Sequence, residues 1–436
     1  MRRKAINELI DWKNKKGHKP IIIQGARQVG KTWLMQEFGK TQYKQIAYIN
    51  FDSNDRMLNL FSGDLNVQRL LTGFELEVGF KINSKDTLII FDEIQECPKA
   101  ITSLKYFNEN VPEFDIVAAG SLLGVAHHEG TGFPVGKVEF MDLYPLSFDE
   151  FLGALGEEQL LELAQKQDFQ MIKIFKDKFE NLIKQYCYIG GMPAVVQDFV
   201  NNRDFNAVRA IQKEIITAYE KDFSKHIPAN TVEKIRMLWN SIPSQLTKEN
   251  KKFIYNAVRK GARAKDFETA LSWLANCGLV YKVNRIKKPA LPITAYEDFD
   301  AFKLFILDIG LLGALTNLET KTLLEGNKIF VEFKGAIAEQ YVLQQFKTIK
   351  DLPIFYWSNE TSRSEIDFVI QIDSKVIPIE VKSTTNLKAK SLKIYREKYK
   401  PEISIRTSLT DYKEDEGLYN IPLYLIEMIK AIISAN

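Results

Sequence analysis

The residues with the clearest chemical capability form a glycine-containing loop near the N-terminus. The loop reads GARQVGKT over residues 25–32, after an apolar run and before a helix-like stretch at residues 33–38. Its glycines let the backbone bend so that successive N–H groups point inward at an anion, and the N-terminus of the following helix adds partial positive charge. Lys31 can reach the β and γ phosphates of a nucleotide, and the Thr32 hydroxyl can ligate Mg²⁺. The spacing predicts a nucleotide-binding loop made of Gly25, Ala26, Arg27, Gln28, Val29, Gly30, Lys31 and Thr32.

An acidic pair follows about sixty residues later. Asp92 and Glu93 end the apolar run 88–91. A carboxylate at the end of a buried strand is costly unless it faces a cation, so Asp92 is expected to hold Mg²⁺ through water beside Thr32. Glu93 would then polarise the water that attacks the γ-phosphate. The alternative is an ordinary strand-end turn or first helical turn, where acids are also favoured, but the pairing with the loop favours catalysis.

Two further polar residues have open roles at this site. Ser121 follows the next apolar run and is either a polar sensor of the γ-phosphate or part of a Gly-Ser turn. Arg27, inside the loop, is either a phosphate contact or a surface residue.

Four short apolar runs must position these groups. Helix-length segments separate them, which is the pattern of buried parallel strands in an α/β sheet. The runs are residues 21–23, 46–50, 88–93 and 116–121. The first part of the chain is therefore predicted to be an α/β core with a parallel sheet.

Composition limits the classes of protein to consider. With 436 residues, 45% apolar and 26% charged, the chain is expected to form two to four globular domains. It has no secretory signal pattern and no apolar run long enough to cross a bilayer, so no membrane association is expected. Cys97, Cys187 and Cys277 lack metal-site spacing, which excludes a zinc knuckle or ribbon and favours a reducing, cytoplasmic location.

The middle of the chain is strongly basic. Residues 225–288 hold fourteen Lys or Arg and four Asp or Glu, which is what a polyanion-binding surface needs, although a solvated helical surface can also be basic. Apolar residues recur at helical spacing in three segments before a β-like run, the order expected of a winged helix with its wing at 279–293. Such a module binds DNA or protein partners. The candidate phosphate contacts are Arg259, Lys260, Arg263 and Lys265.

Charged residues also mark the end of the chain. Residues 364–370 and 376–382 are predicted to form a β-hairpin that brings Asp367 near Glu380. Side chains alternate along a strand, so Glu380 and Lys382 share a face. Glu339 lies on a helix-like segment expected to pack on the hairpin. A cross-strand salt bridge on a solvated face is the alternative, but two charges within apolar strands are costly without a role.

Several motifs together resemble the prokaryotic AAA+ ATPases that carry a C-terminal domain of uncharacterised function. They are the loop at 25–32, FDEIQ at 91–95, AGS at 119–121 and LYPLSF at 143–148. The resemblance implies ATP as the nucleotide and a helical lid, with GGMP at 190–193 near the nucleotide. It also implies an arginine finger, but the sequence does not show which arginine has that role. A ring-shaped homo-oligomer, a monomer and a complex with a protein partner all remain open.

The C-terminal pattern of one aspartate followed by ExK resembles the PD-(D/E)XK nuclease superfamily. That resemblance implies a catalytic core of Asp367, Glu380 and Lys382 with Glu339 as an accessory acid. Clustered carboxylates in such a site hold Mg²⁺ or Mn²⁺, and the lysine helps to orient or deprotonate water. Ile366 stands where the strictest pattern has proline.

The sequence thus predicts four domains: an AAA+ core (1–150), a helical lid (151–225), a winged helix-turn-helix (226–298) and an α/β nuclease-like domain (299–436). The function expected is Mg²⁺-dependent ATP hydrolysis coupled to DNA binding or processing in the cytoplasm. The alternative is a nucleotide-switched protein-interaction module whose nuclease-like domain cuts nothing.

Overall fold

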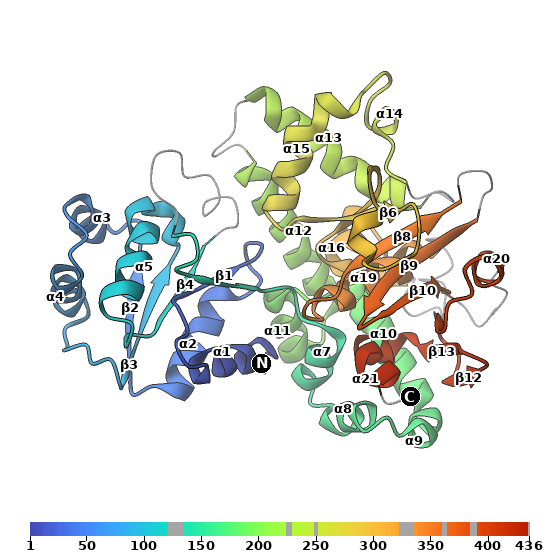
Figure 1. The fold of residues 1–436 in the computed structure, drawn as a ribbon, viewed down its shortest axis with the longest axis horizontal. Coiled ribbons are helices and arrows are strands. Elements are labelled where there is room, and N and C mark those ends of the chain that lie inside the picture. Colours follow the sequence, from blue (N-terminus) through green and yellow to red (C-terminus); the bar gives the residue numbers. More distant parts are fainter. Residues whose placement is uncertain are drawn as a thin grey trace. The chain divides into compact units, whose positions relative to one another are not determined.

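The computed structural model describes residues 1–120, 134–223, 229–247, 252–321, 335–359, 364–383 and 390–434 (Figure 1). Contacts divide the chain into two units. The N-terminal unit comprises Arg2–Tyr144 with Asn276–Gly278, and the C-terminal unit comprises Met1, Pro145–Ala275 and Leu279–Asn436. Within the described ranges, no helix has the length and apolar character required to cross a membrane.

The N-terminal unit is built on a five-stranded sheet in which every neighbouring pair is parallel. The strand order is β2-β3-β4-β1-β5. The four predicted strands are confirmed, and β5 is an addition, because its sequence EFMD is too polar to show as an apolar run. The strands are β1 (Ile21–Gln24), β2 (Gln45–Asn50), β3 (Thr87–Asp92), β4 (Ile116–Ala119) and β5 (Glu139–Asp142).

Helices connect β1 to β2, β2 to β3 and β3 to β4, as parallel pairing requires. Amphipathic sequences with apolar residues at helical spacing form them, and Asn54 and Asn66 cap α3 and α4 by accepting a backbone hydrogen bond. The helices are α1 (Ala5–Asn14), α2 (Lys31–Gln42), α3 (Asp55–Ser62), α4 (Val67–Val78), the 3₁₀ turn η1 (Ile94–Glu96) and α5 (Pro98–Asn110).

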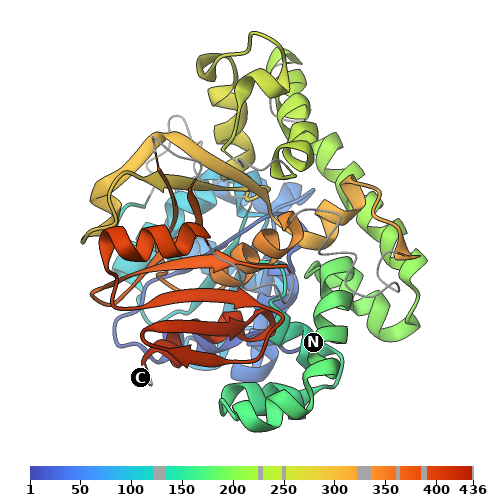
Figure 2. The same ribbon diagram turned by 90° about the vertical axis from the view of Figure 1, so that its right-hand side faces the viewer.

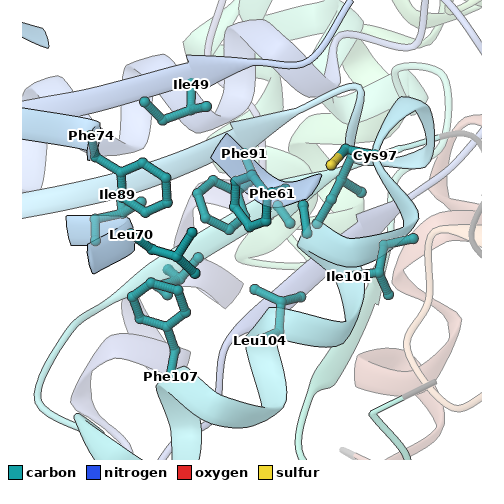
Figure 3. Close-up of a cluster of buried hydrophobic side chains, with 14 of the residues drawn as sticks. Ile49, Phe61, Leu70, Phe74, Ile89, Phe91, Cys97, Ile101, Leu104 and Phe107 are labelled. Atoms are coloured by element: carbon teal, nitrogen blue, oxygen red, sulfur yellow. The ribbon is translucent and has the colours of Figure 1, made fainter. Parts of the chain in front are cut away.

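Aromatic packing fixes the end of β3, the strand that carries the acidic pair. Phe91 is fully buried and lies in a cluster with Phe61, Phe74 and Phe107 (Figure 3). Its ring centroid lies 5.5 Å from those of Phe51 and Phe74. Phe61 and Phe107 pack edge-on against it at 6.2 and 6.4 Å. Edge-to-face pairs of this kind contribute about 0.5–1.5 kcal/mol each beyond their buried area. The cluster therefore holds the residue immediately before Asp92 in one position.

The C-terminal unit begins with a helical segment. The described part of the predicted lid is helical, and the predicted boundary after residue 150 falls within α7. A capping box between Ser147 and Glu150 starts α7. The helices are α7 (Phe148–Ala154), α8 (Glu158–Gln165), α9 (Phe169–Ile174), α10 (Lys176–Ile189), α11 (Pro193–Asn202), α12 (Phe205–Asp222), α13 (Ala229–Leu246), α14 (Tyr255–Val258) and α15 (Ala264–Asn276).

An eight-stranded mixed sheet forms the rest of this unit, running in Figure 2 from the yellow-orange β6–β7 hairpin to the red strands. Its order is β12-β13-β11-β10-β9-β8-β6-β7. The strands are β6 (Val280–Ile286), β7 (Glu297–Ile306), β8 (Ile354–Ser358), β9 (Glu365–Ile372), β10 (Lys375–Val381), β11 (Ser404–Ser408), β12 (Lys413–Asp415) and β13 (Leu418–Pro422). The accompanying elements are η2 (Ile293–Tyr296), α16 (Ile309–Leu315), α19 (Ala336–Lys347), α20 (Lys390–Tyr399), η3 (Leu423–Met428) and α21 (Ile429–Ser434).

The structure differs from the sequence expectation where a separate wing was predicted at residues 279–293. Strand β6 occupies part of that range and pairs with β7 on one side and with β8 on the other. Strand β8 in turn pairs with β9, and β9 pairs with β10. The expected wing is therefore part of the same sheet as the β9–β10 hairpin that carries Glu380 and Lys382. The predicted boundary between residues 298 and 299 falls inside β7.

Candidate functional site

The nucleotide-binding loop lies between β1 and α2. Gly25 and Gly30 have φ angles of 153° and 95°, and Gly30 is the residue before the first turn of α2. A Cβ atom at Gly25 would lie 2.3 Å from the carbonyl oxygen of Leu143, so only glycine fits. Ala26 and Val29 are buried and Gln28 is exposed. The predicted loop is thus tight, with its glycines where the backbone requires them.

A residue that the sequence reasoning missed braces this loop. Arg3 is buried, and its guanidinium donates to the carbonyl oxygens of Val29 at 3.0 Å and Tyr144 at 2.6 Å. A guanidinium can satisfy several acceptors in a fixed geometry, so Arg3 ties the start of the chain to the loop. In the sequence Arg3 is one of several basic residues near the N-terminus, and no local pattern distinguishes it.

Lys31 is held inside its own loop. Its Nζ donates to the carbonyl oxygens of Gly25 at 2.9 Å and Ala26 at 2.8 Å. Burial lowers the pKa of Lys31 to about 8, and the nearby charges of Glu93 and Asp92 oppose that shift only in part. An ammonium group with a lowered pKa gains from a phosphate, which restores its charged form.

ATP binding should therefore take up a proton at about pH 8.5 and weaken as the pH rises above about 8. Protons are taken up and not released because Lys31 is partly neutral in the free protein at that pH, whereas bound phosphates raise its pKa and favour the charged ammonium form. Calorimetry in two buffers of different ionisation enthalpy measures the uptake. In Lys31→Arg the guanidinium stays charged, so its binding should take up no proton. Binding by the wild type without proton uptake would contradict the assignment.

Thr32 and Asp92, predicted to lie together, are in contact. The Thr32 hydroxyl donates to Asp92 Oδ2 at 2.7 Å, and Asp92 is 3% exposed. The Tyr48 hydroxyl donates to the same oxygen at 2.7 Å, and burial with this contact raises the pKa of Tyr48. Strand β2 places Tyr48 there, since β2 pairs with β3 up to the register Asn50 to Asp92. No sequence pattern marks Tyr48, because its contact depends on strand pairing.

This donor set fits Mg²⁺. Thr32 supplies a hydroxyl oxygen and Asp92 a buried carboxylate, and the two oxygens lie within one hydrogen bond of each other. Mg²⁺ prefers oxygen ligands, takes few from protein and completes its shell with water and phosphate oxygens. Thr32 and Asp92 are therefore the residues that would hold the ion when a nucleotide is bound.

Glu93 follows Asp92 in an unusual backbone conformation. Its φ is 50°, in the left-handed region that non-glycine residues rarely adopt, and its N–H donates to Asp92 Oδ1 at 3.0 Å. The carboxylate is half-buried and accepts from Gln95 Nε2 at 2.5 Å.

Of the other predicted nucleotide contacts, Arg27 is half-buried. Ser121 lies outside the described residues.

The C-terminal prediction concerns a second site, on the β9–β10 hairpin. These strands are antiparallel, as expected. Asp367 Oδ2 accepts from the Val381 N–H at 2.8 Å, and Lys382 Nζ lies 2.6 Å from Glu380 Oε1. Glu380 is 6% exposed, and its Oε2 has no hydrogen-bond partner. Burial raises the pKa of Glu380, and the charge of Lys382 opposes that shift.

A second lysine pairs with two further carboxylates near this group. Lys303 on β7 is fully buried, with its Nζ 2.6 Å from Glu365 Oε1 and 3.4 Å from Glu339 Oε2. Glu339 on α19 is itself buried. We call the six residues of this group the carboxylate cluster: Lys303, Glu339, Glu365, Asp367, Glu380 and Lys382. The sequence reasoning found four of them and missed Lys303 and Glu365.

As placed, the carboxylate cluster does not fit a divalent ion. In the described part of the chain, no three His, Cys, Asp or Glu side chains converge in a way that could hold a metal. Of the three predicted metal ligands, Glu339 is engaged by Lys303, Glu380 by Lys382 and Asp367 by a backbone N–H. We therefore derive no hydrolytic step at this site.

Three of the predicted phosphate contacts lie in the connection between α14 and α15, and the fourth, Lys265, lies in the first turn of α15. All four side chains, Arg259, Lys260, Arg263 and Lys265, are exposed. The connection is ordered by local hydrogen bonds: the Gly261 N–H donates to Asn256 Oδ1 at 2.7 Å, and the Arg263 N–H donates to Asp266 Oδ2 at 3.0 Å. The structure thus has three exposed cations on this short turn and a fourth at the start of α15.

Comparison with known families divides the chain into three segments. Residues 17–152 match a family described as an AAA domain. Residues 180–322 and 334–426 match two families described as domains of unknown function, DUF8612 and DUF4143. A comparison with curated proteins gave no match.

Solved structures give only distant similarity. The Walker-type ATPase PABY2304 of Pyrococcus abyssi is 14% identical over 72% of this chain and 95% of its own, with a TM-score of 0.43. The Aeropyrum pernix ORC1 protein in complex with DNA is 13% identical over 72% and 91%, with a TM-score of 0.29. The replication initiator DnaA, bound to AMPPCP and single-stranded DNA, is 15% identical over 62% and 85%, with a TM-score of 0.27. The segment 17–152 therefore combines a parallel sheet and a nucleotide-binding loop with a match to the AAA domain family.

Proposed function

We propose that the N-terminal unit hydrolyses ATP with Mg²⁺ and that hydrolysis is coupled to DNA binding by the C-terminal unit. The observation that carries the ATPase proposal is the contact between Thr32 and Asp92 at the end of the loop, with Glu93 directly after it. The Thr32 hydroxyl and the buried Asp92 carboxylate can ligate an ion, and the adjacent Glu93 carboxylate can act as a base.

The chemistry assigned to these residues is an in-line displacement at the γ-phosphate. Lys31 exchanges its two loop carbonyls for phosphate oxygens, which carry more negative charge. Thr32 and Asp92 would hold Mg²⁺, which would supply charge neutralisation at the phosphates. Glu93 takes the proton of the attacking water, whose oxygen bonds to the γ-phosphorus as the bond to the leaving ADP breaks.

The four exposed cations in the α14–α15 connection and the first turn of α15 support the DNA proposal. Lysine and arginine side chains that contact phosphates release counterions, so their number sets the salt dependence of binding. Because the hydrogen bonds from Gly261 to Asn256 and from Arg263 to Asp266 order the backbone of the turn, that backbone loses less conformational freedom on binding.

Substituting Arg259, Lys260, Arg263 and Lys265 together by alanine should reduce the slope of log affinity against log salt by about 3 to 4, at about 0.9 per phosphate contact. Fluorescence anisotropy with a labelled duplex at several salt concentrations measures the slope. The control is Lys166→Ala with Lys173→Ala, which removes exposed lysines of the same unit and should leave the slope unchanged. An unchanged slope in the fourfold variant, or binding indifferent to salt, would contradict the proposal.

A nucleotide-switched protein-interaction module is the second candidate function. It is favoured by the ion pairs that lysines form with the predicted catalytic acid Glu380 and the predicted accessory acid Glu339. The ATPase rate with and without DNA separates the two candidates, measured in the wild type and in the variants Lys31→Ala and Glu380→Ala. Stimulation by DNA that is lost in Lys31→Ala supports DNA coupling, whereas indifference to DNA supports the switch. DNA nicking that survives Glu380→Ala would come from outside the carboxylate cluster.

A further inference from the structure

Lys303 is a fully buried cation that the proposed ATPase chemistry does not use. Its Nζ lies 2.6 Å from Glu365 and 3.4 Å from Glu339, and 5.0 Å from the centre of the Tyr356 ring. It comes from β7, Glu339 from α19 and Glu365 from β9, so three separate elements meet at one ammonium group.

The surroundings keep this lysine charged. Burial by itself would lower the pKa of Lys303, but the carboxylates of Glu365, Glu339 and Asp367 raise it above its ordinary value. A buried ion is tolerated only when its partners satisfy it, and removing one partner leaves an uncompensated charge. The carboxylate cluster therefore needs the charge of Lys303 to compensate its buried carboxylates.

We infer that the ammonium group of Lys303 is the resident cation of the carboxylate cluster and takes the place of a divalent metal ion there. It binds Glu339 and Glu365, while Lys382 binds Glu380. A divalent ion placed among these carboxylates would be repelled by both ammonium groups and would compete with them for the carboxylate oxygens that they hold. The cluster then assembles and stays folded without divalent metal, whether or not the N-terminal unit hydrolyses ATP.

The first test asks whether the cluster binds a metal. Mn²⁺ is titrated into the full chain without nucleotide and followed by electron paramagnetic resonance, with Asp92→Asn as the background so that the nucleotide site does not contribute. We expect no stoichiometric Mn²⁺ site that depends on Asp367 or Glu380. A site that is present in this background and lost on adding Asp367→Asn or Glu380→Gln would overturn the inference.

The second test removes the cation. Lys303→Met keeps most of the length of the side chain, removes its charge and leaves Glu339 and Glu365 without their shared cation in a buried site. Hydrogen exchange of the full chain should be faster by about a hundredfold in α19 and β9. Adding Glu339→Gln and Glu365→Gln to Lys303→Met should recover most of the protection, since the opposing charges are then gone. Lys375→Met, on the partly exposed start of β10, is the matched control and should leave exchange in α19 unchanged.

Divalent metal completes the second test. Mn²⁺ should leave exchange of the wild type unchanged, because Lys303 already holds the carboxylates. Unchanged exchange in Lys303→Met, or wild-type protection in α19 and β9 that rises with Mn²⁺, would refute the assignment. If Lys303→Met does not fold, the Mn²⁺ titration of the folded Asp92→Asn background still decides the question.

Discussion

Replacing Glu93 by glutamine should leave ATP binding intact while ATP turnover falls by about 10²–10⁴-fold, the range that a positioned general base supplies. Glutamine has nearly the same shape but cannot take a proton from the attacking water. It can still bond Gln95, so the left-handed turn at Glu93 is kept. Steady-state phosphate release measures turnover, and binding of a fluorescent ATP analogue measures affinity.

The same 3₁₀ turn offers a control for this variant. Glu96 is exposed at the end of η1, and Glu96→Gln removes the same charge from the same turn. We expect its turnover to match the wild type. If Glu93→Gln hydrolyses ATP at the wild-type rate, or if Glu96→Gln is equally impaired, the loss does not come from a base at residue 93.

Replacing Asp308 by alanine should destabilise the C-terminal unit by about 3–5 kcal/mol, through a lost helix cap and buried donors left without partners. Asp308 is fully buried. Its Oδ1 accepts from the Leu311 N–H at 3.0 Å, and its Oδ2 accepts from the Gly191 N–H at 2.6 Å and from Gln344 Nε2 at 3.0 Å. One carboxylate thus joins the start of α16, the turn before α11 and helix α19.

Hydrogen exchange of α10 and α16 in the full chain measures this loss. Asp204 is the matched control, because it also caps a helix but is exposed, and Asp204→Ala should cost about 1 kcal/mol. A loss of about 1 kcal/mol or less in Asp308→Ala would show that the buried contacts of Asp308 contribute little.

Asp308 also bears on the glycine pair at 190 and 191. A Cβ atom at Gly190 would lie 2.2 Å from Asp308 Oδ1, and one at Gly191 would lie 2.2 Å from the carbonyl oxygen of Leu146. The resemblance assigns this pair to a lid motif near the nucleotide. In the structure the glycines allow close packing inside the C-terminal unit, and their role towards the nucleotide stays a prediction.

Local patterns in the sequence predict those parts of the structure that depend on neighbouring residues. The loop at 25–32 and the four apolar strands follow from glycine spacing and short apolar runs, and the β9–β10 hairpin follows from two apolar strands joined by a short turn. The contact between Thr32 and Asp92 could also be predicted, because both follow buried parallel strands. Predicting these features does not require knowing which residues far apart in the sequence are in contact.

The residues that were missed are those whose partners lie far away in the sequence. Arg3 contacts Val29 and Tyr144, and Tyr48 contacts Asp92 through strand pairing, and neither contact leaves a local signal. The continuity of β6 with β8 was missed for the same reason. Lys303 did leave one signal. It is a single lysine within the apolar run AFKLFIL, where an unpaired charge would be costly, and that cost points to a buried partner.

The position of β1 has a consequence for protein synthesis. The nucleotide-binding motif is complete once residue 32 has left the ribosome, yet β1 has β4 on one side and β5 on the other, and both strands are made much later. The carbonyl that packs against Gly25 belongs to Leu143, after β5. Domains generally fold as units during translation, and distant pairings close last. A nascent chain that ends before β5 therefore carries the whole motif without the site, and nucleotide binding begins only when Leu143 has emerged.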